Sequence, residues 1–131
     1  MARSLSAILP VHNAEATLHR QLAGCLEVLE DLSAPFELLI VDDGSSDRTE
    51  EIATEYTRRY PQVRFTRHPF KKGAAEAVRT GLERTRGEVV FVFCDERHVG
   101  REELQRIGRL ERTAELARFG SDPRSRRTAP R

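Results

Sequence analysis

Three short polar segments of the chain combine carboxylates with side chains that donate and accept hydrogen bonds. Each follows an apolar run, and they lie at 12–15, 42–47 and 94–96. Ionised carboxylates accept hydrogen bonds from the N–H and O–H groups that the base and ribose of a nucleotide present. A further carboxylate can hold a Mg²⁺ or Mn²⁺ ion that bridges phosphates. Together the three segments predict a nucleotide site with a weakly bound divalent cation.

Each segment also has a simpler explanation when it is taken alone. Asp42–Asp47 has the composition of a turn followed by a helix cap, His12 and Asn13 suit a loop, and Cys94–Glu96 suits a solvated strand end. Their common placement favours a site, because ligands of open parallel sheets bind beyond the carboxyl ends of the strands. A dinucleotide site is disfavoured, since the first of these turns lacks the G-x-G-x-x-G pattern.

Alternating apolar runs and amphipathic segments predict the elements that position these groups. Apolar runs predict four strands, at 5–11, 36–41, 63–66 and 88–93. Apolar residues spaced at three and four predict four helices, at about 14–32, 47–60, 73–82 and 101–117. This alternation is typical of an α/β protein with a Rossmann-like open parallel sheet, in the order 3-2-1-4, with helices on both faces. Ser46 or Asp47 is expected to cap the second helix, with Glu50 completing a capping box.

Length and composition indicate one soluble globular domain. The chain has 131 residues and a net charge of +1, so no overall field attracts it to nucleic acid or to an anionic membrane. Its two cysteines form no metal-binding or disulfide pattern, and no apolar stretch reaches the ~18 residues of a membrane span. We therefore expect a cytoplasmic protein. Residues 1–119 should form the domain, and residues 120–131 should form a disordered tail rich in Arg and Pro.

Four segments resemble motifs of the family 2 glycosyltransferases. Leu9–Glu15 (LPVHNAE) resembles the family's opening IPVYNEE, and Ile40–Asp47 (IVDDGSSD) resembles VVDDGSTD. Gly73–Leu82 resembles the GxGAAxRTGL helix of the polyprenyl-phosphate sugar transferases in that family, and Gly87–Phe91 resembles the strand that leads to the metal-binding DxD motif. The resemblance covers most of the chain. It implies a GT-A fold, of which this chain would be the N-terminal, nucleotide-sugar-binding half.

The resemblance also implies roles for individual residues. The expected nucleotide-binding residues are Pro10, Val11, Asn13, Asp42, Asp43, Lys72 and Asp95. Among them, Asp42 and Asp43 should meet the uracil or guanine and the ribose of a UDP- or GDP-linked sugar, and residues 10–13 should line the base pocket. Lys72 and Arg79 fall where the family often keeps basic or helix-anchoring residues, and contact with phosphate and a solvated face explain them equally well.

The chain departs from the family pattern at two places. At the DxD position it has Cys94, Asp95 and Glu96. Glu96 is the expected metal ligand, because its carboxylate suits Mg²⁺ or Mn²⁺, whereas the thiol of Cys94 is neutral near pH 7 and prefers softer metals. The acceptor half of the family fold, with its general base, should follow the fourth strand, but the chain ends at Arg131. The expected function is therefore donor binding with impaired sugar transfer.

Two other functions are compatible with the same residues. The protein could be an active transferase whose site is completed by another subunit, or a structural or interaction module that has lost ligand binding. The assembly is predicted from the strand at 89–93, which would be an edge strand with neither charge nor proline. Such an edge predicts a homodimer in which the two fourth strands meet.

Overall fold

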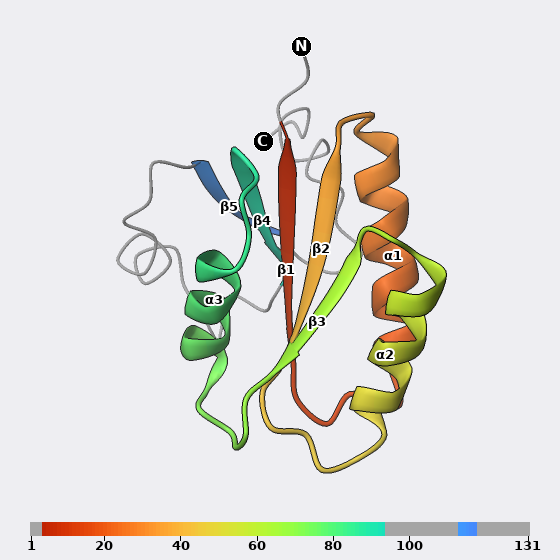
Figure 1. The fold of residues 1–131 in the computed structure, drawn as a ribbon, viewed down its shortest axis with the longest axis vertical. Helices are drawn as coiled ribbons and strands as arrows, with labels where there is room; N and C mark the ends of the chain where they lie inside the picture. Colours follow the sequence, from red (N-terminus) through yellow and green to blue (C-terminus); the bar gives the residue numbers. More distant parts are fainter. Residues whose placement is uncertain (1–3, 94–112, 118–131) are drawn as a thin grey trace, which may run out of the picture.

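The computed structural model describes residues 4–93 and 113–117. Its centre is a parallel five-stranded sheet in the order β3-β2-β1-β4-β5 (Figure 1). The strands are β1 (Leu5–Val11), β2 (Phe36–Asp42), β3 (Val63–Arg67), β4 (Val89–Phe93) and β5 (Thr113–Ala117). The predicted order 3-2-1-4 of the first four strands is confirmed, and the fifth strand extends the sheet beyond β4.

Helices cover both faces of this sheet, as predicted from the sequence. α1 (Leu18–Asp31) and α2 (Thr49–Arg59) lie on one face, and α3 (Ala74–Glu83) lies on the other (Figure 1). Each helix follows a strand in the chain, so the carboxyl ends of β1, β2 and β3 all turn back at the same edge of the sheet. This edge is the lower one in Figure 1.

Each central strand contributes to two hydrophobic cores. Leu9 and Ile40 belong to the core beneath α1 and α2, whereas Ile8 and Leu39 belong to the core beneath α3. Successive side chains of a strand point to opposite faces, so strands covered on both faces need continuous apolar runs. Gly81 lets α3 approach the sheet closely, because a Cβ at this position would lie 2.5 Å from Cγ2 of Ile8.

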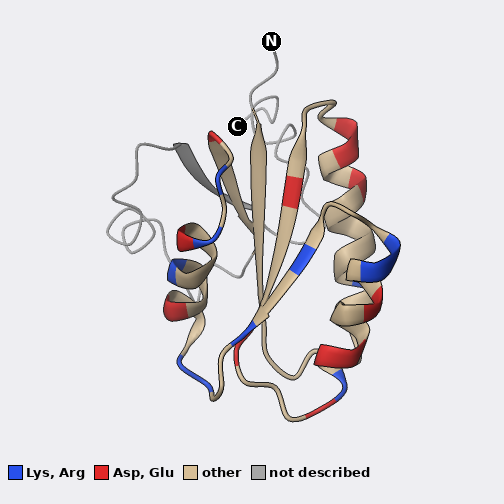
Figure 2. Cartoon of the chain, viewed as in Figure 1, with Lys and Arg blue, Asp and Glu red and all other residues tan. Residues whose placement is uncertain are grey.

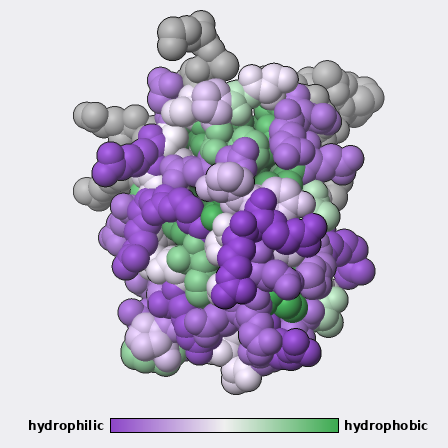
Figure 3. Space-filling model, turned by 45° about the vertical axis from the view of Figure 1, so that its right-hand side comes forward, coloured by the Kyte–Doolittle hydropathy of each residue, from purple (hydrophilic) through white to green (hydrophobic). Residues whose placement is uncertain are grey.

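The surface of the described part is polar. Charged residues lie mostly on helices and turns, while the strands carry few of them (Figure 2). The face shown in Figure 3 is largely hydrophilic, with hydrophobic side chains visible between the charged ones. Phe70 is the large hydrophobic side chain that stands out among the described residues, with 64% of its surface exposed. None of the described helices has the length and hydrophobicity that crossing a bilayer requires.

Two predicted helix starts differ from the structure. α1 begins at Leu18 rather than near Ala14, because residues 14–17 form a turn in which the carbonyl of Ala14 accepts from the N–H of Leu18 over 2.8 Å. At α2, Asp47 caps the helix as predicted, because its carboxylate accepts from the N–H of Thr49, the first helical residue, over 2.9 Å. The other half of the predicted capping box is wrong: Glu50 lies 3.6 Å from Arg67 and is not seen to bond the N–H of Asp47 within the described residues.

The predicted edge strand and the helix after it also need correction. β5 pairs with β4 along its whole length, so β4 lies inside the sheet and its hydrogen-bonding groups face strands on both sides. The helix predicted over 101–117 is wrong over 113–117, and the remainder of that segment lies outside the described residues. The homodimer through β4 therefore loses its physical basis. The proposed tail at 120–131 also lies outside the described residues.

Candidate functional site

The β1–α1 and β2–α2 turns are joined by reciprocal hydrogen bonds at the carboxyl edge of the sheet. The N–H of Asn13 donates to Oγ of Ser45 over 2.7 Å, and the N–H of Ser46 donates to Oδ1 of Asn13 over 2.8 Å. Asn13 has a φ of 49°, a conformation that asparagine adopts more readily than most residues. A change in the conformation of either turn would therefore disturb the hydrogen bonds of the other.

Hydrogen bonds between the β1–α1 and β2–α2 turns continue towards the first residues of α1 and α2. The N–H of Ala14 donates to Oγ1 of Thr49 over 2.8 Å, and the N–H of Glu15 donates to Oδ2 of Asp47 over 3.1 Å. In return, the N–H of Arg48 donates to Oε1 of Glu15 over 3.0 Å. These bonds satisfy amides that lie before the helices, and they make one continuous polar rim from two loops.

Asp42 is completely buried at the end of β2 and is paired within the protein. Its Oδ2 lies 3.0 Å from Nη1 of Arg67, and its Oδ1 accepts from the N–H of Ser45 over 2.9 Å. Arg67 also donates to the carbonyl of Ser45 over 2.8 Å and lies 3.6 Å from Glu50. The guanidinium of Arg67, the last residue of β3, thereby balances the charge of Asp42 and fixes the start of the β2–α2 turn.

Asp43 is also buried, and its carboxylate organises the loop between β3 and α3. Oδ1 accepts from Nδ1 of His68 and from the N–H of Lys72, both over 2.8 Å, and Oδ2 accepts from the N–H of Gly73 over 2.9 Å. Burial by itself would raise the pKa of Asp43, but these hydrogen bonds outweigh it and lower the pKa below its usual value. Asp43 is therefore an anion at neutral pH.

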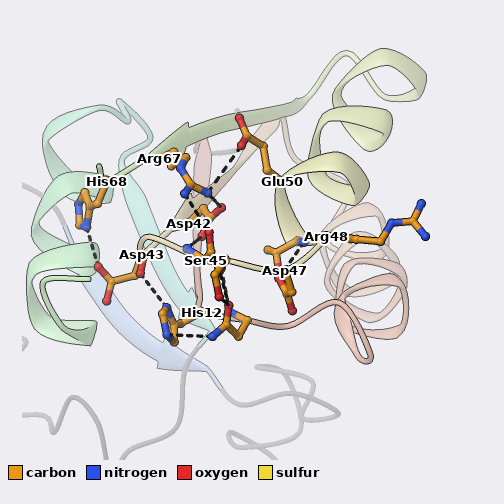
Figure 4. A network of polar contacts seen from close by, with 12 residues as sticks. His12, Asp42, Asp43, Ser45, Asp47, Arg48, Glu50, Arg67 and His68 are labelled. Atoms are coloured by element: carbon orange, nitrogen blue, oxygen red, sulfur yellow. Dashed lines mark hydrogen bonds and ion pairs between the residues drawn. The ribbon is translucent and has the colours of Figure 1, made fainter. Parts of the chain in front are cut away.

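The two aspartates point away from each other, Asp42 towards Arg67 and Asp43 towards His68 (Figure 4). Gly44 follows them with a φ of +70°, and a Cβ there would lie 2.5 Å from the carbonyl carbon of Phe70. The N–H of His68 donates to the carbonyl of Asp42 over 2.8 Å. The loop from His68 to Gly73 is thus seated directly on the β2–α2 turn.

Most of the predicted nucleotide-binding residues lie along this edge. They are Pro10, Val11, Asn13, Asp42, Asp43 and Lys72. Val11 is buried beside Asp42 in the β1–β2 register, whereas Asn13 and Lys72 are exposed. Nζ of Lys72 lies 5.4 Å from the centre of the Phe70 ring. Asp95 and Glu96 lie outside the described residues.

The prediction from sequence missed residues at the end of β3. Arg67 and His68 hold the two aspartates, and Thr80 of α3 contacts Nε2 of His68 over 2.8 Å. A signal was present, because these two residues directly follow a predicted strand whose carboxyl end lies on the same edge.

A divalent cation does not fit the described part of the rim. Residues 4–93 contain no cluster of three or more metal-ligating His, Cys, Asp or Glu side chains. The carboxylates of Asp42 and Asp43 are already neutralised or hydrogen-bonded, which leaves no open set of oxygens of the kind that Mg²⁺ or Mn²⁺ requires. The metal site expected at Glu96 remains a prediction.

Relatives that are dolichyl-phosphate beta-glucosyltransferases match about two thirds of the chain. A dolichyl-phosphate beta-glucosyltransferase, ALG5A, from Trichomonas vaginalis is 33% identical over 94 residues, which are 68% of this chain and 29% of that protein. The human dolichyl-phosphate beta-glucosyltransferase is 31% identical over 97 residues, which are 69% of this chain and 30% of that protein. The chain spans less than a third of the length of these two relatives.

Solved glycosyltransferase structures share the fold. The mannosyltransferase PcManGT from Pyrobaculum calidifontis, solved with GDP-Man and Mn²⁺, has a TM-score of 0.60 at 22% identity over 69% of this chain and 26% of that one. S. aureus TarS 1-349, solved with UDP-GlcNAc, has a TM-score of 0.59 at 23% identity over 69% and 26% of the two chains. These are GT-A folds. Residues 6–96 match the family described as Glycosyl transferase family 2, and the chain belongs to this family.

Proposed function

We propose that this chain provides the nucleotide-sugar donor site of a family 2 glycosyltransferase. The observation that supports it best is the continuous polar rim formed by the β1–α1 and β2–α2 turns at the carboxyl edge, within the region matched to the family. Ligands of open parallel sheets bind at this edge. The structural relatives PcManGT and TarS were solved with GDP-Man and UDP-GlcNAc, so the proposed donor is a GDP- or UDP-linked sugar.

Within this proposal the rim residues divide into two kinds. Asp42 and Asp43 are buried and paired, so they shape the site. Asn13 and Lys72 are exposed and supply an amide and an ammonium group for the ligand. Pro10 and Val11, next to the end of β2, would form an apolar wall beside the base.

Sugar transfer itself is proposed for the whole protein. An inverting transfer needs positive charge on the departing diphosphate and a base that removes the proton of the acceptor hydroxyl. In residues 4–93 the rim carboxylates Asp42 and Asp43 are engaged in internal bonds, so neither is suited to act as that base. The base and the metal ligands, with Asp95 and Glu96 as candidates for the metal, would come from elsewhere in the protein.

Calorimetric titration with UDP, GDP and their sugar conjugates tests donor binding, with and without Mn²⁺. We expect one of the two nucleotide series to bind, and we expect Lys72→Gln to weaken that binding by roughly 1 kcal/mol, in line with the loss of a charged contact. Arg58→Gln is the matched control, since Arg58 is an exposed cation in the last turn of α2, away from the rim. Equal losses in both variants would contradict the assignment of Lys72.

A second function has one observation in its favour. The internal pairing of both Asp42 and Asp43 suits a structural or interaction module that keeps the family fold without a ligand. The same titration separates the two proposals. Absence of binding by either nucleotide series, in the presence of Mn²⁺ and with a folded protein, would favour the module over the donor site.

A further inference from the structure

His68 connects three elements of the rim through its two ring nitrogens. Its side chain is buried at the end of β3, with Nδ1 2.8 Å from Oδ1 of Asp43 and Nε2 2.8 Å from Oγ1 of Thr80. Asp43 belongs to the β2–α2 turn and Thr80 to the middle of α3. A single imidazole therefore links that turn to the helix behind the β3–α3 loop.

The ionisation of Asp43 fixes the direction of the first of these bonds. Asp43 can only accept, so Nδ1 of His68 must carry a hydrogen. The hydroxyl of Thr80 can either donate to Nε2 or accept from it, so it satisfies this nitrogen whether or not Nε2 carries a hydrogen. Removal of the Thr80 hydroxyl would therefore leave Nε2 without its partner.

Asp43 has little capacity left for a ligand. Its two oxygens accept from three donors, two of which are backbone amides of the β3–α3 loop, and only 3% of the residue is exposed. Two of these three bonds join Asp43 to the loop at Lys72 and Gly73.

The loop that Asp43 holds carries the only lysines of the chain. Lys71 and Lys72 are both exposed, and neither has a carboxylate partner within the described ranges. Phe70 beside them is exposed as well, although its backbone is pressed against Gly44. The loop thus presents two ammonium groups from a backbone that is fixed at several points. Such fixed positive charge suits phosphate groups.

We propose that Asp43, His68 and Thr80 are positioning residues, which hold Lys71 and Lys72 at the rim for the phosphates of the donor. Asp43 then acts on the phosphates through the loop. The inference rests on the proposed donor site. In the free protein, the hydrogen bonds to Asp43 protect the amides of Lys72 and Gly73 from exchange. His68 and Thr80 in turn hold Asp43 in position.

Thr80→Val and Thr80→Ser form a matched pair for the test. Valine keeps the shape of threonine but lacks the hydroxyl, whereas serine keeps the hydroxyl. Amide hydrogen exchange followed by NMR in the absence of ligand should be at least about tenfold faster at Lys72 and Gly73 in Thr80→Val, and within about twofold of the original rate in Thr80→Ser. The amides of Ile8 and Leu39, in the sheet core, should keep their rates in both variants, which excludes global unfolding.

Nucleotide affinity supplies the second measurement. Titration of UDP and GDP should give roughly three- to tenfold weaker binding for Thr80→Val and nearly unchanged binding for Thr80→Ser. Unchanged exchange at Lys72 and Gly73 in both Thr80→Val and His68→Gln would overturn the proposal. It would also be overturned if Asp43→Asn weakened nucleotide binding while those two amides stayed as protected as before, because Asp43 would then contact the ligand directly. Failure of the unmodified protein to bind either nucleotide, with exchange responding as expected, would refute the donor site and leave the positioning of the loop supported.

Discussion

The two ends of β2 each have a buried or partly buried carboxylate that fixes a loop, yet the two loops lie at opposite edges of the sheet. Near the start of β2, Glu37 accepts from Oγ of Ser6 over 2.7 Å and from the N–H of Arg86 over 2.8 Å, and it pairs with Arg64. After its end, Asp43 accepts from the N–H of Lys72 and from His68, and so holds the loop that contains Lys72. In both clusters the carboxylate accepts from a backbone amide of the loop and from a side chain of another segment.

The difference lies in the edge of the sheet at which each loop is found. The Glu37 cluster closes the α3–β4 turn onto the amino edge of the sheet, and Gly87 completes it by donating to Oγ of Ser6 over 2.6 Å. Both loops display cations, since Arg84 and Arg86 are exposed as Lys71 and Lys72 are, but of the two clusters only that of Asp43 lies at the carboxyl edge, beside a second turn with an exposed asparagine. A buried carboxylate at a strand end is thus a sign of loop fixation. Its functional meaning depends on the edge at which the fixed loop lies.

The largest expected effect comes from the glycines that allow each loop to pack. A Cβ at Gly44 would lie 2.5 Å from backbone of Phe70, and a Cβ at Gly87 would lie 2.5 Å from the backbone nitrogen of Ser6. We expect Gly44→Ala to destabilise by about 2–4 kcal/mol, because it adds strain at positive φ to the clash, and Gly87→Ala to destabilise by about 2 kcal/mol or more. Urea unfolding measures both. A loss below about 1 kcal/mol in either variant would mean that the corresponding loop can move away.

Neutral replacements of the two carboxylates should separate function from stability. Asp43→Asn and Glu37→Gln should each lower the free energy of unfolding by about 1–3 kcal/mol, since each leaves buried donors poorly paired. Asp43→Asn should in addition weaken nucleotide binding, whereas Glu37→Gln should leave it unchanged. Urea unfolding and calorimetric titration of the same two samples provide the check. Weaker binding in Glu37→Gln would show that the two ends are coupled.

Acid should weaken both clusters. Burial raises the pKa of Glu37, but hydrogen bonds from the Arg86 N–H and the Ser6 hydroxyl, with the Arg64 guanidinium, lower it overall from a usual value of 4.5, and the pKa of Asp43 is lowered from 3.8. A carboxyl group whose pKa is lower in the folded state stabilises the fold above its unfolded pKa and loses that contribution as the pH falls through the folded pKa. Stability should therefore decline below about pH 5, and the decline should be shallower in Asp43→Asn and Glu37→Gln. An unchanged pH slope in both variants would contradict these pKa directions.

The smallest expected change in stability comes from a substitution outside both clusters, which serves as a reference for the other variants. Gly24 is in the middle of α1, and a Cβ there would have no neighbour within 4 Å. Gly24→Ala should stabilise the protein by about 0.5–1 kcal/mol, because alanine is a better helix former and restricts the unfolded chain. The midpoint of urea unfolding should rise. A fall would indicate that residues outside the described ranges pack against this position.

The arrangement of the sheet could be predicted from the sequence because its strands are covered on both faces. The run Phe36–Val41 is apolar except for Glu37 near its start, which does not suit a solvent-facing sheet, and the helix periods between such runs leave few other folds. β5 could not be predicted in this way. Its sequence, TAELA, is short and lies in a segment whose apolar spacing also suits a helix, so only its pairing with β4 identifies it as a strand.

The position of the polar segments could be predicted from the sequence, but the partners of their side chains could not. Asp42 and Asp43 follow β2 and lie beside the β1–α1 turn, as expected for residues at the carboxyl ends of neighbouring parallel strands. Their partners, Arg67 and His68, are distant in the chain, and nothing in the local sequence specifies which cation or imidazole will approach which carboxylate. The capping box failed for the same reason, because Glu50 lies near Arg67 of another strand.

The hydrogen bonds between the β1–α1 and β2–α2 turns limit where residues can be inserted or deleted in this chain. Asn13, Glu15 and their partners in the β2–α2 turn match amide to acceptor one for one, so an inserted or deleted residue in either turn would shift the whole series out of register. Within residues 4–93, the connection 32–35 shows no hydrogen bond to either rim turn, and the side chain of Ser33 is exposed. Tags, probes and natural insertions should therefore be accommodated after α1, while the spacing of the rim stays fixed.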